Sequence, residues 1–360
     1  MTERMKVLDM LEKGTITASE ATELIKSLDG QPPPIIYPPS PPPHIEAPDI
    51  PDLGWIGNLK NAFGNFGSWS SPEEHVTITT GIENFVKELN IKGKNSEVTI
   101  EPHEGNELIA DISYVTKKGY DSDPDFGFIT EDGVFRLKYD ESAFHSVGAR
   151  IRIPKEVSID NLKLKSSNAE VRAKDITGKN IKLETKNAEV DAENIFCETI
   201  FCTTKNAEIR LDDVKAHNID CRTKNAEIKV DNIKANEAQI YTSNALIEIS
   251  DSDLNKISAK TSNADLHLFD PINTDRDELT KLEAETSNGA IKLKLPDVDR
   301  KFKIRASTSN GHIKNDFDNM ILKVNEKNYL DAISPDYDNV NNKTKISLQT
   351  SNGNIKINKI

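Results

Sequence analysis

A four-residue block that returns every 19 positions restricts the possible folds more than any other feature of this 360-residue chain. The block reads Asn-Ala-acid-aliphatic, with Leu246 in place of the acid in one copy. A constant period of this length is typical of stacked repeats. The asparagines that mark the block, and that we expect to stack as an amide ladder, are Asn168, Asn187, Asn206, Asn225, Asn244 and Asn263.

Apolar and polar residues alternate inside each repeat, which is the period of a β-strand. In one repeat Val190 precedes an expected corner at Ile195, and Ile200 and Cys202 follow it. A coil with two such strands cannot bury their apolar edges alone, but copies stacked about 4.8 Å apart enclose a narrow core. An aromatic content of only 6% suits so thin a core. The expected fold is mainly β: a parallel β-solenoid, or β-helix, of coils of about 19 residues.

Other polar residues recur with the same period and predict further columns along the solenoid. One is a column of threonine hydroxyls, at Thr204, Thr223, Thr242 and Thr261. Another is a row of glutamates that would repel one another, at Glu170, Glu189, Glu208 and Glu227. We expect this row to be screened by the lysines that precede its last three members, which are Lys186, Lys205 and Lys224.

Acidic residues also mark one corner of successive coils. Stacked at the coil spacing they would form a negative ridge that attracts a cationic peptide or the basic patch of a protein partner; ordinary solubility is the alternative role. A formal net charge of −13 and the lack of a basic stripe in the sequence argue against nucleic acid as a ligand. The residues of this candidate acidic ridge are Glu193, Asp212, Asp213, Asp231, Asp251 and Asp270.

The sequence contains no pattern that indicates a catalytic, metal or cofactor site. The acidic residues follow the repeat instead of breaking it, and the histidines lack metal-ligand spacing. Asp121, Asp123 and Asp125 have the spacing of a calcium loop, but Pro124 interrupts it, which favours a solvated acidic turn. We therefore expect a binding or scaffold protein with no cofactor; the alternative is a β-helix protein that binds or cleaves a polysaccharide.

Three cysteines, Cys197, Cys202 and Cys221, fall at inward positions. Because they show neither a metal spacing nor a secretory framework, we expect buried reduced thiols. The alternative is a disulfide between Cys202 and Cys221, which lie one coil apart.

Four segments follow from composition and capping signals. Residues 1–30 predict a helical hairpin that is too small to fold alone. We expect it to associate with a partner protein or a second copy; packing within the same chain is the alternative. Residues 31–53 are a proline-rich linker, and residues 72–360 form the solenoid. Residues 54–71 form an amphipathic segment that either caps the solenoid or contacts a membrane surface. Its apolar residues are Trp55, Ile56, Leu59, Phe63, Phe66 and Trp69.

Outside the regular repeats the coils are expected to be less uniform. Residues 72–165 read as irregular early coils, with a loop over residues 120–133 and a first imperfect copy of the block at residues 94–98. Toward the end, Thr-Ser-Asn-Gly corners at residues 286, 308 and 350 are expected to continue the stack, with an excursion or a degenerate coil between residues 315 and 342.

The chain resembles bacterial proteins of the LiaX and YvlB type. The resemblance is carried by Leu11-Glu-Lys-Gly-Thr-Ile-Thr-Ala-Ser-Glu-Ala in the hairpin, by Ile153-Pro-Lys, and by the Thr-Lys-Asn-Ala and Thr-Ser-Asn-Gly corners. It implies a SHOCT-like helical module joined to an adhesin-like β-strand-repeat domain. It also implies a role in the cell-envelope stress response, with sensing of cationic antimicrobial peptides, and it provides no catalytic residues.

The expected location follows from the same features. The sequence shows no signal peptide and no run of 18 apolar residues. We therefore expect a protein in the cytoplasm or peripheral to the cell membrane, whereas the family resemblance also allows exposure at the cell surface.

Overall fold

The structure is a computed structural model that describes residues 73–83, 85–120, 123–272, 279–296 and 300–360. The expected hairpin (1–30), linker (31–53) and amphipathic segment (54–71) lie outside these residues. The described part is almost entirely β, with one short 3₁₀ helix, η1 (Tyr337–Asn339). No helix among the described residues has the length and apolar character needed to span a membrane.

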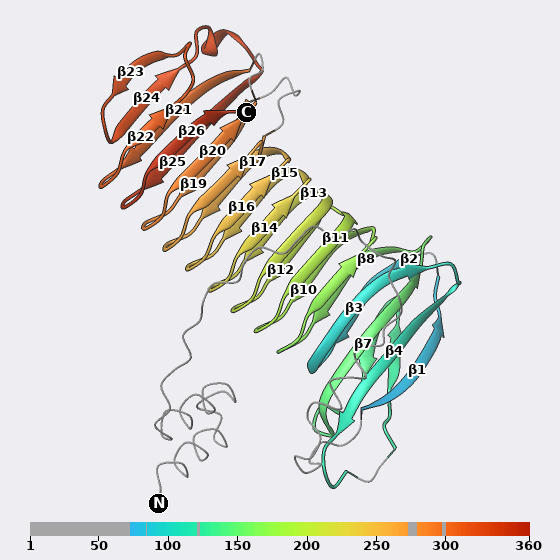
Figure 1. The fold of residues 1–360 in the computed structure, drawn as a ribbon. Helices are drawn as coiled ribbons and strands as arrows, with labels where there is room; N and C mark the ends of the chain where they lie inside the picture. Colours follow the sequence, from blue (N-terminus) through green and yellow to red (C-terminus); the bar gives the residue numbers. More distant parts are fainter. Residues whose placement is uncertain (1–72, 84, 121–122, 273–278, 297–299) are drawn as a thin grey trace, which may run out of the picture. The chain divides into compact units, whose positions relative to one another are not determined.

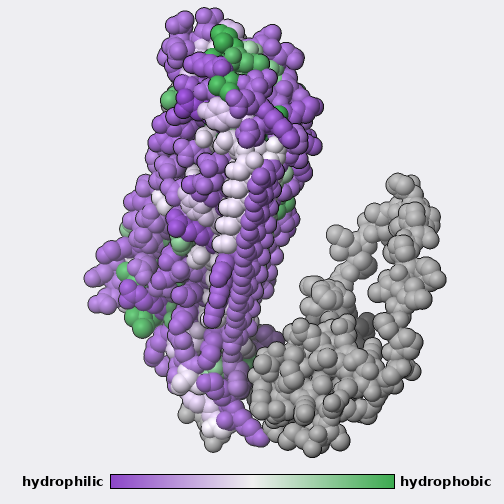
Figure 2. Space-filling model, turned by 90° about the vertical axis from the view of Figure 1, so that its left-hand side faces the viewer, coloured by the Kyte–Doolittle hydropathy of each residue, from purple (hydrophilic) through white to green (hydrophobic). Residues whose placement is uncertain are grey.

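The repeats form two parallel stacks of strands, which Figure 1 shows as an extended row. Figure 2 shows straight columns of hydrophilic residues along one face of this row. In stack 1 each strand follows the repeated asparagine, and the regular members are β9 (Val171–Lys174), β11 (Val190–Phe196), the first part of β13 (Ile209–Arg222), β14 (Ile228–Asp231), β16 (Ile247–Ser250) and β18 (Leu266–Phe269). In stack 2 each strand leads to the next asparagine, and the members are β8 (Ser158–Lys165), β10 (Gly178–Glu184), β12 (Thr199–Thr203), the second part of β13, β15 (Lys234–Tyr241), β17 (Asp253–Lys260) and β19 (Leu279–Glu285).

The register of the strands is the repeat period itself. Val190 lies opposite Ile209, and Ile209 lies opposite Ile228, each pair in parallel strands. All three side chains are fully buried between the stacks. The prediction of a parallel β-solenoid with aliphatic side chains stacked one coil apart is therefore confirmed for the central coils.

One detail of the predicted coil is corrected, and the expectation for the cysteines is met. Ile195 is not the corner, because its side chain is buried in the core and only 1% exposed. The chain turns at the preceding residue, Asn194, which has a φ of 51°. The cysteines are buried, free thiols, as expected for reduced residues, and burial raises the pKa of Cys197 to about 12.

At the C-terminal end the coils do not stack in sequence order. β20 (Ile291–Leu295) pairs with β26 (Ile355–Lys359), and β26 pairs with β22 (Ile313–Asn315). In stack 2, β25 (Lys343–Thr350) likewise lies between β19 and β21 (Lys301–Thr308). The last coil of the chain is therefore inserted between two earlier ones, which corrects the expectation that the corners simply continue the stack. The excursion over residues 315–342 contains β23 (Ile321–Asn325) and β24 (Tyr329–Ile333), which cover the edge of β21 as antiparallel strands.

The N-terminal end repeats this arrangement. The coil formed by β2 (Phe85–Lys92) and β3 (Asn95–His103) lies between the coil of β8 and β9 and a coil formed by β6 (Val134–Lys138) and β7 (Phe144–Pro154). Antiparallel strands then close the end: β4 (Glu107–Thr116) pairs with β7, and β1 (Glu74–Gly81) pairs with β4. These strands lie at the opposite end of the row from β23 and β24 (Figure 1).

The segment predicted as a loop over residues 120–133 contains a strand. β5 (Gly127–Glu131) pairs antiparallel with β6 through a two-residue turn at Asp132 and Gly133, which both have positive φ. An Asp-Gly pair favours this turn because both residues tolerate the left-handed conformation. Of the aspartates with calcium-loop spacing that precede this turn, Asp121 lies outside the described residues. Asp125 is exposed and forms an ion pair of 2.7 Å with Lys138.

Candidate binding surfaces

The repeated asparagines form the amide ladder that the sequence predicts. Asn206 donates its side-chain N–H to Asn187 Oδ1 at 2.6 Å, and Asn225 donates to Asn206 at 2.7 Å. The ladder extends beyond the regular repeats and follows the spatial order of the coils, including the inserted one. Its full sequence of rungs is Asn95, Asn168, Asn187, Asn206, Asn225, Asn244, Asn263, Asn288, Asn352 and Asn310.

The threonine hydroxyls do not bond to one another along the expected column; they bond to backbone carbonyls. Thr204 donates its hydroxyl to the carbonyl oxygen of Ala188 at 3.0 Å, and Thr242 donates to Ala226 at 3.1 Å. Each hydroxyl therefore links its own asparagine corner to the corner of the neighbouring coil through a backbone carbonyl, instead of bonding to the threonine of that coil. Ladder and threonines together hold the corner rigid, and we assign both a structural role.

The opposite corner carries a second column of polar residues, joined in pairs, that the sequence analysis missed. One residue per coil has a φ between 42° and 55°, and it is Asp or Asn in every case. Asn194 donates to Asp175 Oδ1 at 2.6 Å, and Asn232 donates to Asp213. The signal was visible as a 19-residue recurrence of Asp or Asn, the residues that best tolerate the left-handed region. The residues of this αL corner are Asp175, Asn194, Asp213, Asn232, Asp251 and Asp270.

The candidate acidic ridge follows this corner and consists of two adjacent columns. Glu193, Asp212 and Asp231 lie in register on stack 1. Asp213, Asp251 and Asp270 belong to the αL corner one residue further along each coil. The structure thus brings all six predicted residues to one edge of the solenoid, with amides of the αL corner between some of the carboxylates.

Neighbouring side chains form an ion pair or a hydrogen bond with some carboxylates of the acidic ridge. Lys174 forms an ion pair of 2.7 Å with Glu193, and Ser250 donates its hydroxyl to Asp231 at 2.6 Å. Burial raises the pKa of Asp212, and the nearby carboxylates, Asp213 first, raise it further. Burial followed by the charge of Asp251 also raises the pKa of Asp270. The ridge therefore holds negative charges at a cost, because both groups resist ionisation.

The glutamate row is compensated by residues other than those expected. Arg172 pairs with Glu170 at 2.6 Å, and Lys229 lies 3.4 Å from Glu227. Arg210 pairs with Glu208 at 3.2 Å. Among the residues that the structure describes, none of the three lysines at positions 186, 205 and 224 forms an ion pair, so direct pairing falls to other residues of the strands. Each of these partners lies two places along the strand from its glutamate and therefore on the same face, which explains the pairing.

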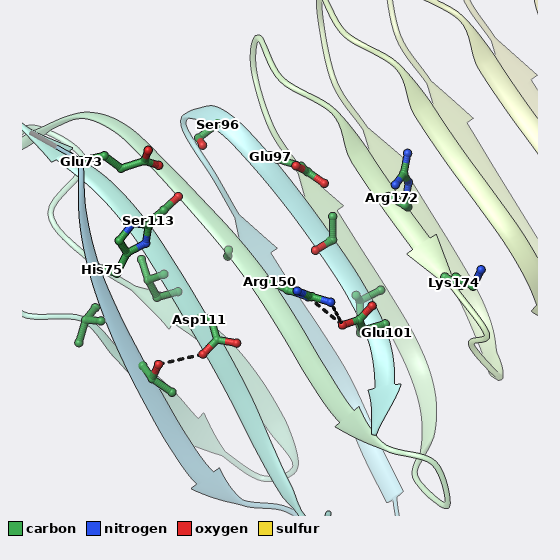
Figure 3. A pocket seen from close by; sticks show the side chains of 16 residues that line it. Glu73, His75, Ser96, Glu97, Glu101, Asp111, Ser113, Arg150, Arg172 and Lys174 are labelled. Carbon is green, nitrogen blue, oxygen red and sulfur yellow. Dashed lines mark hydrogen bonds and ion pairs between the residues drawn. The ribbon is translucent and has the colours of Figure 1, made fainter. Parts of the chain in front are cut away.

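A groove of about 530 Å³ lies on the outer face of the N-terminal strands β1, β4, β7, β3 and β9 (Figure 3). Arg150 and Glu101 meet across it at 2.6 Å, and Thr77 donates its hydroxyl to Asp111 at 2.8 Å. Gly148 on β7 lets the serine hydroxyls of Ser96 and Ser113 approach the backbone, because a Cβ there would lie 2.7 Å from both hydroxyl oxygens. Sequence analysis missed this groove because antiparallel end strands build it.

The groove is polar and of mixed charge. Of its four carboxylates, those of Glu101 and Asp111 are paired with arginines, the latter with Arg152 at 2.8 Å. No group of three potential metal ligands occurs in the part of the chain that the structure describes. The side chains that line the groove include no aromatic ring other than that of His75.

Comparisons with known proteins give two family matches. The family described as Toastrack DUF4097 matches residues 60–358, and the family described as a SHOCT-like domain matches residues 2–32. No curated protein matches the chain.

Several solved bacterial structures share extended similarity at low identity. A putative adhesin from Bacteroides fragilis NCTC 9343 is 13% identical, with 79% of this chain and 97% of that chain covered and a TM-score of 0.34. A putative lipid binding protein from Parabacteroides distasonis ATCC 8503 is 10% identical, with coverages of 82% and 98% and a TM-score of 0.36. A putative cell adhesion protein from Clostridium sporogenes ATCC 15579 is 12% identical, with coverages of 80% and 100% and a TM-score of 0.24.

Proposed function

We propose a binding function for this chain, which belongs to the Toastrack DUF4097 family. In this proposal the solenoid is a rigid, non-catalytic scaffold, and the acidic ridge holds a cationic peptide or the basic segment of a protein partner. The observation that supports it is the register of Glu193, Asp212 and Asp231, which places like charges on successive coils at one edge.

The ridge suits a cationic ligand for an electrostatic reason. Carboxylates stacked about 4.8 Å apart repel one another, and a chain of positive charges laid along them relieves that repulsion. The raised pKa of Asp212, caused by burial and then by its acidic neighbours, is the local sign of this repulsion. Because the αL corner and the asparagine ladder fix the backbone, the ridge is ordered before the ligand arrives, so little conformational entropy is lost on binding.

The test is a titration of the full-length protein with an oligolysine peptide. The variant carries Asp212→Asn, Asp213→Asn, Asp231→Asn and Asp251→Asn; asparagine also tolerates the left-handed conformation of positions 213 and 251, so the corner is kept. A control variant removes four exposed acids elsewhere, through Glu104→Gln, Glu131→Gln, Asp318→Asn and Glu326→Gln. We expect at least tenfold weaker binding for the ridge variant only. Equal affinity of the two variants would exclude the ridge as the binding surface.

The biological setting of this function is proposed from the resemblance to LiaX- and YvlB-type proteins. In that setting the protein acts in the cell-envelope stress response, the ridge binds cationic antimicrobial peptides, and the SHOCT-like residues 2–32 mediate association with a partner or a second copy. Fractionation of cells with and without a cationic peptide tests it. A protein that keeps the same fraction and the same partners under both conditions would argue against a stress role.

Membrane contact by residues 54–71 is a separate part of the proposal. Liposomes should sediment with the full-length chain, and deletion of residues 54–71 should abolish sedimentation without changing the melting temperature of the solenoid. Loss of the thermal transition on deletion would instead support the capping role that the same residues could have.

A further inference from the structure

We propose that the C-terminal part of stack 2 binds a linear polyanion that carries phosphate groups. Four lysines lie there in one straight column, each opposite the next in neighbouring parallel strands: Lys256, Lys281, Lys345 and Lys303. We call this set the lysine column. It shares no residue and no strand with the acidic ridge, and it does not depend on the function proposed above.

The charges of the lysine column are not compensated within the described part of the protein. None of the four ammonium groups forms an ion pair or a hydrogen bond with a described residue. Lys256, Lys281 and Lys345 are exposed to solvent. Like charges placed directly opposite each other on neighbouring strands destabilise a sheet. An external chain of anions would remove this cost, in the same way that counterions are exchanged when a basic surface binds a phosphate backbone.

A second basic column lies on stack 1 of the same coils, and some of its lysines have side-chain partners. His267, Lys292, Lys356 and Lys314 are also in register. Here, however, Lys292 donates to the ring nitrogen Nε2 of His267 at 3.0 Å, and Lys314 pairs with Asp316 at 3.1 Å. The difference between the two columns makes the lysine column the better candidate and provides a matched control.

The surroundings of the lysine column favour a narrow ligand over a flat one. Glu237 continues the column at one end, and Glu283 stands beside Lys281 on the same face; both line a shallow groove of about 150 Å³ with Lys256 and Lys281. An anionic membrane surface would press against these glutamates, whereas a single chain can follow the lysines past them. Further along the same face, Lys343 lies in register with Lys301 and widens the basic surface near the end of the stack.

The side chains also discriminate between kinds of polyanion. Lysine binds phosphate as a point charge and imposes no planar geometry. The lysine column therefore selects a ligand by the spacing of its negative charges and not by a base or a sugar. Aromatic rings, which single-stranded nucleic acids use as stacking platforms, are absent from the lysine column and from the residues paired beside it, Ser258, Glu283, Ser347 and Arg305. The ligand class is therefore a linear phosphate polymer without bases.

The experiment measures binding of inorganic polyphosphate to the full-length protein. The column variant carries Lys281→Gln and Lys345→Gln; the control carries Lys292→Gln and Lys356→Gln, which changes the net charge equally. We expect the column variant to bind at least tenfold more weakly, the control to change less than twofold, and the wild-type affinity to fall with salt at a log–log slope of about −3 for four contacts. Equal losses in both variants, or no loss in either, would overturn the proposal.

Three further probes separate the sources of phosphate. Orthophosphate at the same phosphate concentration, a single-stranded oligonucleotide, and phosphatidylglycerol vesicles are each titrated against the wild type. Weaker binding of all three than of polyphosphate supports the linear polymer. Equal or tighter binding of any one of them would contradict it, and would identify a simple anion site, a nucleic-acid surface or a membrane surface respectively. Thermal melts of both variants confirm that the coils remain folded, since all four substituted lysines lie on outer faces of the stacks.

Discussion

Single residues at the two corners determine how each coil closes. The αL corner requires a positive φ, and Asp or Asn meets that requirement at little cost in the coils from Asp175 to Asp270. The asparagine corner requires a side chain that both donates and accepts, because each rung bonds to the coil on either side. These two requirements explain why polar residues recur as strictly as the apolar core.

Removal of one rung should lower stability measurably. Asn206→Ala breaks the bond that Asn206 donates to Asn187 and the one that it accepts from Asn225. We expect a loss of about 1–2 kcal/mol in the free energy of unfolding, since each exposed neutral hydrogen bond contributes about 0.5–1 kcal/mol. Denaturant unfolding measures it, with Lys205→Ala at the exposed neighbour as the control. A loss no greater than that of the control would show that the ladder contributes nothing to the free energy of unfolding.

The pH dependence of Asp270 should reveal the strain in the acidic ridge. Burial and the charge of Asp251 raise its pKa above the ordinary value of 3.8, so the folded protein binds the proton more tightly than the unfolded chain. The ionised group therefore lowers stability above the raised pKa, and the penalty disappears as the pH falls below about 3.8. Asp270→Asn should stabilise the protein at pH 7 and have no effect at pH 3.

The control for this prediction is Asp132→Asn. Asp132 has a similar φ of 49° in the exposed β5–β6 turn, so the substitution tests the change of side chain at a left-handed position. Urea melts at the two pH values compare the variants. A stabilisation by Asp270→Asn that persists unchanged at pH 3 would mean that its origin is not the ionised carboxylate.

At the scale of elements, the corners with Gly in place of Ala show how closely the terminal coils approach one another. A Cβ on Gly353 would overlap the carbonyl oxygen of Gly289, and a Cβ on Gly289 would overlap that of Ala264. Glycine is needed here for close approach of the backbone and not for a positive φ. The atoms that require glycine at these corners are therefore backbone atoms of the neighbouring coil.

Gly353→Ala should therefore loosen the inserted coil. The added methyl group meets backbone atoms, which cannot rotate away as a side chain can, and overpacking of this kind costs about 1–3 kcal/mol. Gly127→Ala is the control, because no atom lies within 4 Å of a Cβ at that position. Hydrogen exchange of β25 and β26 should be faster in the first variant and unchanged in the second. Equal protection in both would show that the corner has room for alanine.

At the scale of the whole molecule, both ends of the solenoid are closed by coils stacked out of sequence order and by antiparallel strands. An open end would present unpaired strand edges, which promote end-to-end association. In this fold β25 is held between β19 and β21, and β21 is covered in turn by β24. Residues far apart in the sequence therefore depend on one another for their hydrogen bonds.

Truncation tests this dependence. Removal of residues 341–360 deletes β25 and β26, so β19 and β21 lose their shared partner. We expect loss of hydrogen-exchange protection across residues 301–333, far beyond the deleted coil, while β13 keeps its protection and serves as the internal control. In a solenoid stacked in sequence order, residues 301–333 would stay protected after the same truncation.

The sequence alone determined the central architecture, because a constant 19-residue step leaves one register in which Val190, Ile209 and Ile228 are all buried. It determined the amide ladder for the same reason. The order of the terminal coils could not be predicted, since their Thr-Ser-Asn-Gly corners are interchangeable and any of them can stack on any other. Only the tertiary structure decided that order, and with it the antiparallel end strands and the groove on the outer face of the N-terminal strands. The lysine column was likewise invisible in the sequence, because irregular loops separate its members and only long-range strand pairing brings them into line.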